Sequence, residues 1–70
     1  MSGFVFKVME LQPCCGRIVH QCMFISAFAD HALKKVADLA SAHPGVAYEL
    51  VKTNVFSGTS VVVDTYRVER

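Results

Sequence analysis

The sequence predicts a small α+β protein, in which an antiparallel four-stranded sheet carries one packed helix in the order ββαββ. Four runs rich in β-branched and aromatic residues are separated by turn-forming residues, and the segment between the second and third runs has the hydrophobic period of a helix. Hydrophobic residues make up 53% of the chain and charged residues 19%, a composition typical of a folded chain. With 70 residues the chain has room for a single domain, residues 1–70.

The first two extended runs are predicted to form a hairpin. Residues 4–11 contain aromatic and β-branched side chains and no residue that breaks a strand. Pro13 is expected to mark the end of this strand, because segment 13–16 combines the fixed φ of proline with a glycine, as in a connection between hairpin strands. A second strand is predicted from Arg17 to about Ile25.

One helix is predicted, from Asp30 to His43. Its apolar side chains fall at the three- and four-residue spacings of one helical face: Leu33, Val36, Ala37, Leu39 and Ala40. Asp30 is the expected N-cap, because its carboxylate can accept hydrogen bonds from the free amides of the first turn, and Ser26 is the alternative start. Pro44 and Gly45 are a typical helix stop.

The remaining chain is predicted to form a second hairpin. Residues 46–56 are the third extended run, 57–59 provide a turn, and 60–68 are the fourth run, with a valine triplet at 61–63. No linker, repeat or low-complexity segment interrupts the chain, so a single domain is expected.

Both faces of the predicted sheet are apolar. In the second strand, strict alternation places Val19, Met23 and Ile25 together on one face and a second apolar set on the other. A single helix can cover one face of a four-stranded sheet but not both. We therefore expect a homodimer or another protein partner on the open face or on an edge strand, with these three residues as candidate interface residues. The alternative is a curled sheet that buries part of both faces within one chain.

These features favour a non-enzymatic protein–protein interaction module. The sequence contains no glycine-rich phosphate loop, serine elbow or paired metal histidines, and a domain of this size has little room for a substrate pocket. No catalytic residue and no organic cofactor is therefore assigned. A nucleic-acid-binding accessory protein is the second alternative, but the net charge is only +1 and the basic residues are scattered, so nucleic acid is not the expected partner.

A small zinc-binding module is the first alternative. Four potential ligands lie within nine residues: Cys14, Cys15, His20 and Cys22. His20 and Cys22 are two residues apart on a predicted strand, so they point to the same face. Adjacent cysteines, however, are expected to project in different directions, and the sequence has no C-x2-C pair. The competing interpretation places Cys22 in the core and the other two cysteines in a turn, without a metal.

The stretch from Ala32 to Leu50 has a helical ALKKVADLA pattern followed by HPGVAYEL, and it resembles a pattern in short uncharacterised proteins of phages and other mobile elements. Those proteins look like compact sheets with one helix, similar in build to certain anti-CRISPR proteins. The resemblance implies the same build, and an inhibitor that docks on a host protein complex and blocks it without catalysis. It implies no particular contact residue.

The chain is expected to be cytoplasmic. Its start lacks a basic region followed by a long apolar segment, and no apolar run approaches about eighteen residues, so neither a signal peptide nor a membrane anchor is predicted. The number of cysteines is odd, which fits reduced thiols better than a disulfide framework.

Overall fold

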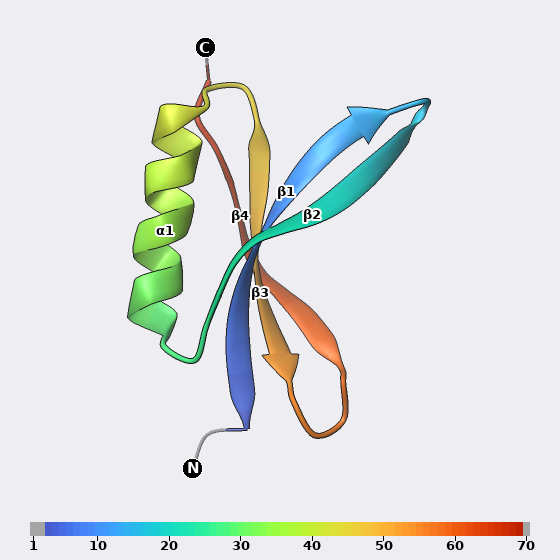
Figure 1. The fold of residues 1–70 in the computed structure, drawn as a ribbon. Coiled ribbons are helices and arrows are strands. Elements are labelled where there is room, and N and C mark those ends of the chain that lie inside the picture. Colours follow the sequence, from blue (N-terminus) through green and yellow to red (C-terminus); the bar gives the residue numbers. More distant parts are fainter. Residues whose placement is uncertain (1–2, 70) are drawn as a thin grey trace.

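The structure, a computed structural model, describes residues 3–69 and confirms the predicted α+β fold with ββαββ order. The elements are β1 (Phe4–Cys14), β2 (Arg17–Ser26), α1 (Ala29–Ala42), β3 (Ala47–Asn54) and β4 (Ser60–Arg67). The strand pairs are antiparallel, and the order β2-β1-β3-β4 places β1 and β3 in the centre of the sheet and β2 and β4 at its edges (Figure 1).

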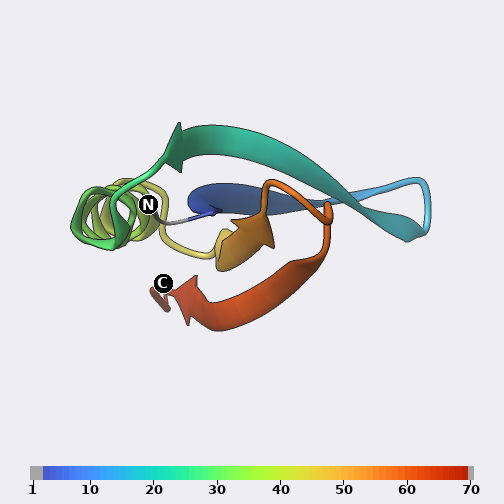
Figure 2. The ribbon, with the colours of Figure 1, turned by 90° about the horizontal axis from the view of Figure 1, so that it is seen from below.

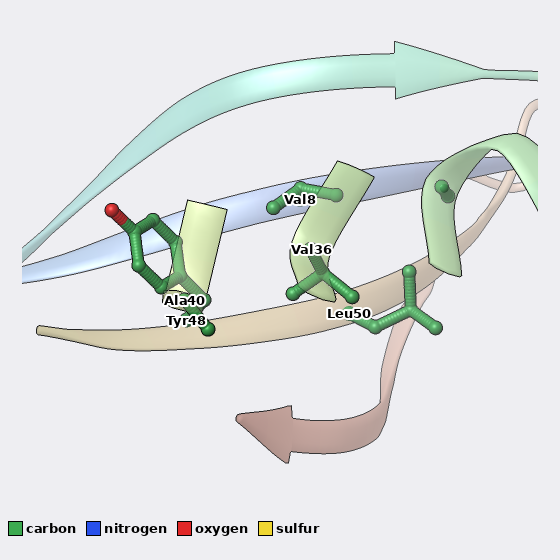
Figure 3. Packing of buried hydrophobic residues seen from close by; sticks show 6 residues of the cluster. Val8, Val36, Ala40, Tyr48 and Leu50 are labelled. Atoms are coloured by element: carbon green, nitrogen blue, oxygen red, sulfur yellow. The ribbon is translucent and has the colours of Figure 1, made fainter. Parts of the chain in front are cut away.

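The core lies between α1 and one face of the sheet. Ala32, Val36 and Ala40 follow one another at four-residue spacing along the helix, and all three are buried. They cluster with three buried side chains of the two central strands, Val8, Tyr48 and Leu50 (Figure 3). Two of the three helical residues are alanines, so the helix axis can approach the sheet closely.

The helix begins one residue earlier than predicted, and its N-cap is Phe28 rather than Asp30. No side chain caps the first turn, but Asp30 lies within it, where its carboxylate complements the positive end of the helix dipole. Ser26 Oγ accepts a hydrogen bond from the Phe28 N–H at 3.0 Å and orients the chain before the helix. Leu33 and Ala37 are exposed, although the hydrophobic period predicts them on the packed face.

β1 continues through Pro13, which the sequence predicts as its end. Pro13 pairs with Ile18 of β2, whereas the pairing of β1 with β3 already ends at Leu11. The two-residue loop makes Cys14 and Arg17 the hydrogen-bonded pair that closes the hairpin, so the Pro13 nitrogen points away from β2. On that side β3 has ended and no strand needs a donor, which is why proline fits within β1.

A bulge in β2 changes which of its side chains share a face. Val8 pairs with Phe24 but Met9 pairs with Cys22, so Met23 has no partner on β1. Directly opposed residues share a face, and successive residues of β1 alternate between faces. Phe24 therefore faces α1 with Val8, while Cys22 faces away. The strict alternation predicted for β2 is wrong here, because the extra residue inverts the pattern.

The molecule is elongated and exposes a large surface. Its principal extents are 40 × 26 × 15 Å, and its radius of gyration is 12.4 Å, compared with about 11 Å for a compact domain of this length. The accessible surface of 4831 Å² exceeds the roughly 4,300 Å² expected for a monomer of this mass. The tip of the β1–β2 hairpin, which projects away from α1, contributes to this shape (Figure 2).

Candidate functional site

The free edge of β4 is apolar. Val61, Val62 and Val63 are consecutive and are 65%, 51% and 52% exposed. Because β4 is an edge strand that pairs with β3 on one side, its other side presents free backbone N–H and C=O groups. The strand contains neither proline nor lysine, which commonly protect an edge from further pairing, and a bulge at Val63 interrupts its pairing with β3. We call Val61, Val62 and Val63 on this free edge the valine edge.

The valine edge presents apolar side chains on both faces of the sheet. Val51 follows the core residue Leu50 in β3 and therefore faces away from α1. Val62 pairs with Val51 and shares that face, whereas its neighbour Val61 points to the other face. The pairing skips Val63, which has no partner on β3. A strand added beside β4 could thus contact valine side chains above and below its own backbone.

The β3–β4 turn carries an exposed aromatic ring. Asn54 Oδ1 accepts hydrogen bonds from the Phe56 N–H at 2.9 Å and the Ser57 N–H at 3.1 Å, which fold the chain directly after β3. Phe56 is 83% exposed, and its ring covers Gly3 so closely that a Cβ atom at Gly3 would lie 2.6 Å from Phe56 Cε2. The Phe56 ring therefore lies on the side of the turn toward the start of β1, not beside the valine edge.

Few charges border the valine edge. Asp64 directly follows the valines, and its Oδ1 accepts a hydrogen bond from the Thr65 N–H at 2.8 Å. Burial, and to a lesser degree the Asp64 carboxylate, raise the pKa of Tyr66 above its usual value. On β3, Lys52 Nζ lies 4.1 Å from the centre of the Phe4 ring, a cation–π contact on the side of β1. Within β4, Asp64 is thus the acidic residue that lies next to the valine edge.

The centre of the face opposite α1 is largely closed. Val51 and Thr53 are buried although both face away from the helix. Thr53 Oγ1 and Ser60 Oγ lie 3.0 Å apart in a hydrogen bond that joins β3 to β4. Across β1, His20 Nδ1 lies 3.7 Å from Glu49 Oε1, so a protonated His20 forms an ion pair there. The curled sheet therefore buries the middle of this face within the chain, and the edges remain exposed.

The predicted interface residues Val19, Met23 and Ile25 are all exposed, but they do not share a face. Val19 pairs with Gln12 on the α1 side, and Ile25 pairs with Lys7 on the opposite side, because the bulge lies between them. These residues line the free edge of β2 instead of forming one continuous surface. Their role in an interface stays a prediction.

The β1–β2 turn brings two sulfur atoms together. Because Cys14 pairs with Arg17, Cys15 and Gly16 form a two-residue loop. Both loop residues have positive φ, 54° at Cys15 and 81° at Gly16, as in a type I′ turn. In this turn the Sγ atoms of Cys14 and Cys15 lie 3.5 Å apart, and both residues are exposed. The expectation that the adjacent cysteines project in different directions is therefore wrong for their sulfur atoms.

His20 and Cys22 lie farther along β2, on the face away from α1, and share that face as predicted. The Cys22 thiol donates a hydrogen bond to the Phe24 carbonyl oxygen at 3.6 Å. Within residues 3–69, no group of three or more His, Cys, Asp or Glu side chains is placed to hold a metal ion. Of the four predicted zinc ligands, the structure brings Cys14 and Cys15 together but does not add His20 and Cys22 to them.

The part of the chain that the structure describes has no pocket and no helix long and apolar enough to cross a membrane. Comparison with protein-family models, with curated proteins and with solved structures finds no match to this chain. The fold and the exposed groups define a small α+β protein with an apolar edge strand and a close cysteine pair. Its function has to be inferred from these two features.

The sequence pattern alone does not identify the valine edge. A valine triplet is equally typical of a central strand that is buried on both faces. Only the sheet order shows that β4 has β3 as its one neighbour. The sequence places the triplet in the fourth predicted strand but does not give the place of that strand in the sheet.

Proposed function

We propose that this protein is a non-enzymatic protein-binding module that accepts an extended segment of a partner protein beside β4. The observation that carries the proposal is the valine edge, three consecutive exposed valines on a strand with a free hydrogen-bonding side. Strand addition derives affinity from main-chain hydrogen bonds and specificity from side-chain contacts. The valine edge offers free backbone groups and apolar side chains at the same place.

The partner segment that fits this edge is extended, rich in β-branched residues and basic at one position. Covering a half-exposed valine contributes roughly 1 kcal/mol, and β-branched side chains pack well against valines on a neighbouring strand. Asp64 directly follows the valine edge. A lysine or arginine opposite Asp64 is therefore favoured, and a carboxylate at that position is disfavoured.

The exposed area of the molecule supports a binding role. The accessible surface of 4831 Å² is about 500 Å² larger than that expected for a monomer of this mass. A standard interface covers about 800 Å² on each partner, so a partner on the valine edge and the adjoining turn would remove the excess. An inhibitor that docks on a host complex, as the resemblance to phage proteins implies, would act through the same edge.

Backbone amide NMR with a synthetic strand tests the proposal. The probe is a soluble peptide of alternating threonine and valine that carries one lysine. We expect chemical-shift changes and slower hydrogen exchange for the amides of β4, because their free side gains hydrogen-bond partners. Val62→Lys should weaken the peptide affinity at least tenfold, since a lysine on an edge strand opposes strand addition.

Leu33→Lys is the matched control. Leu33 is an exposed aliphatic residue of α1, so its replacement adds the same charge away from β4, and the peptide affinity should stay unchanged. Equal losses of affinity in the two variants would show that charge alone weakens binding. Shift changes centred on β2, or none at β4 with millimolar peptide, would contradict the proposed docking surface.

A further inference from the structure

We propose that the Cys14–Cys15 pair is one half of a zinc site, which a second copy of this chain completes with its own pair. The two Sγ atoms lie 3.5 Å apart on an exposed turn. With a Zn–S distance of 2.3 Å, two sulfur atoms on one edge of a tetrahedron are about 3.8 Å apart. A linear, two-coordinate metal would need them about 4.6 Å apart. The observed separation fits the tetrahedral geometry of zinc better.

Two sulfur atoms leave the coordination of zinc incomplete. Structural zinc sites have four nitrogen or sulfur ligands, whereas the described residues of one chain place no third ligand beside the pair. A second hairpin tip, related to the first by a two-fold rotation, supplies two further thiolates and gives a closed four-cysteine site. Because the tip of the β1–β2 hairpin projects from the rest of the molecule, two tips can meet while the sheets stay apart (Figures 1 and 2).

The backbone of the turn gives a second reason to assign a role to these sulfur atoms. Type I′ turns favour Asn-Gly or Asp-Gly, because both loop residues must have positive φ. Cys15 has a φ of 54°, which is unfavourable for a residue that is neither glycine nor asparagine. Strained positions of this kind cluster at functional sites. The conformation of the turn favours asparagine at position 15, but the sequence has a cysteine there.

The charges around the turn suit a thiolate site. When Zn²⁺ binds four thiols, each thiol releases one proton, and the resulting four-thiolate site has a net charge of −2. Arg17 pairs with Cys14 across the hairpin, so the two copies together contribute two positive charges beside the sulfur atoms. No Asp or Glu occurs in the sequence between Glu10 and Asp30. The turn thus offers positive charge to the thiolates, and the carboxylate of its hairpin arms, Glu10, lies four residues before Cys14.

Zinc titration of the reduced full-length chain, followed by native mass spectrometry, tests the proposal. We expect one zinc ion per two chains, in a dimer that dissociates when a chelator removes the metal. Cys15→Asn should lower the zinc affinity at least a hundredfold and abolish the dimer, yet raise the urea midpoint, because asparagine suits the turn. Cys22→Ser removes a thiol elsewhere and should retain the wild-type zinc affinity and stoichiometry.

Four outcomes would overturn the proposal: one zinc ion per monomer, loss of zinc binding in Cys22→Ser, a dimer that persists without metal, or no zinc binding by the folded wild-type chain. The inference is independent of the proposed function at β4. Peptide binding to the valine edge is measured with chelator present, so the failure of either proposal can be recognised without the other.

Discussion

At the scale of single residues, Tyr48 and Glu10 show how the core accommodates a polar group. Tyr48 is the largest of the fully buried side chains, and its hydroxyl donates a hydrogen bond to Glu10 Oε2 at 3.1 Å. The other oxygen of Glu10 accepts a hydrogen bond from the Gln12 side-chain amide. Burial, followed by the hydrogen bond and the charge of Glu10, raises the pKa of Tyr48 above 10.0. The neutral phenol is therefore the form that the folded state accepts.

The raised pKa of Tyr48 predicts a loss of stability at alkaline pH. The unfolded chain releases the Tyr48 proton near pH 10.0, whereas the folded chain keeps it. The contribution of Tyr48 to the free energy of unfolding is therefore complete below pH 10.0 and is lost as the pH rises through the folded-state pKa. Urea unfolding between about pH 8 and about pH 11 measures the decline. Tyr48→Phe should make the decline with pH less steep, leaving the part that Tyr66 contributes. An unchanged decline in Tyr48→Phe would contradict this account.

At the scale of elements, the attachment of α1 to the sheet depends on one row of side chains. Val36 lies fully buried in the middle of that row. Val36→Ala removes two methyl groups from the core and should lower the free energy of unfolding by about 2 kcal/mol. Leu33→Ala removes more atoms from an exposed position and should change it by less than about 0.5 kcal/mol. Comparable losses in urea unfolding would mean that the helix packs along the Leu33 row instead.

Elements that depend only on residues close together in the sequence could be predicted from it. The helix follows from its hydrophobic period and its stop at Pro44, and the first hairpin follows from its turn residues. The features that differ from the sequence prediction depend on neighbours in space. Pro13 fits within β1 because β3 has ended beside it, and the bulge at Met23 exists only relative to the register of β1. The closeness of the Cys14 and Cys15 sulfur atoms likewise depends on the left-handed turn and not on their spacing in the sequence.

At the scale of the whole molecule, the two proposed contacts use opposite ends of the sheet. β1 and β3 are antiparallel, so the β1–β2 turn and the β3–β4 turn lie at opposite ends (Figure 1). A zinc-linked pair joined at the cysteine turns therefore leaves both valine edges free. Two edges on one particle bind a surface that carries many partner strands more tightly than one edge does, because the second contact forms at a high effective concentration.

This coupling predicts that zinc strengthens binding only where two partner strands are within reach. On a surface densely coated with the strand peptide, zinc should slow the dissociation of the wild-type protein at least tenfold relative to chelator, as measured by surface plasmon resonance. On a sparse coating, zinc should have no effect. Cys15→Asn should dissociate at the chelator rate on both surfaces. An equal effect of zinc on this variant would place the metal elsewhere, and weaker wild-type binding with zinc would show that the cysteine turn and the valine edge compete for the same space.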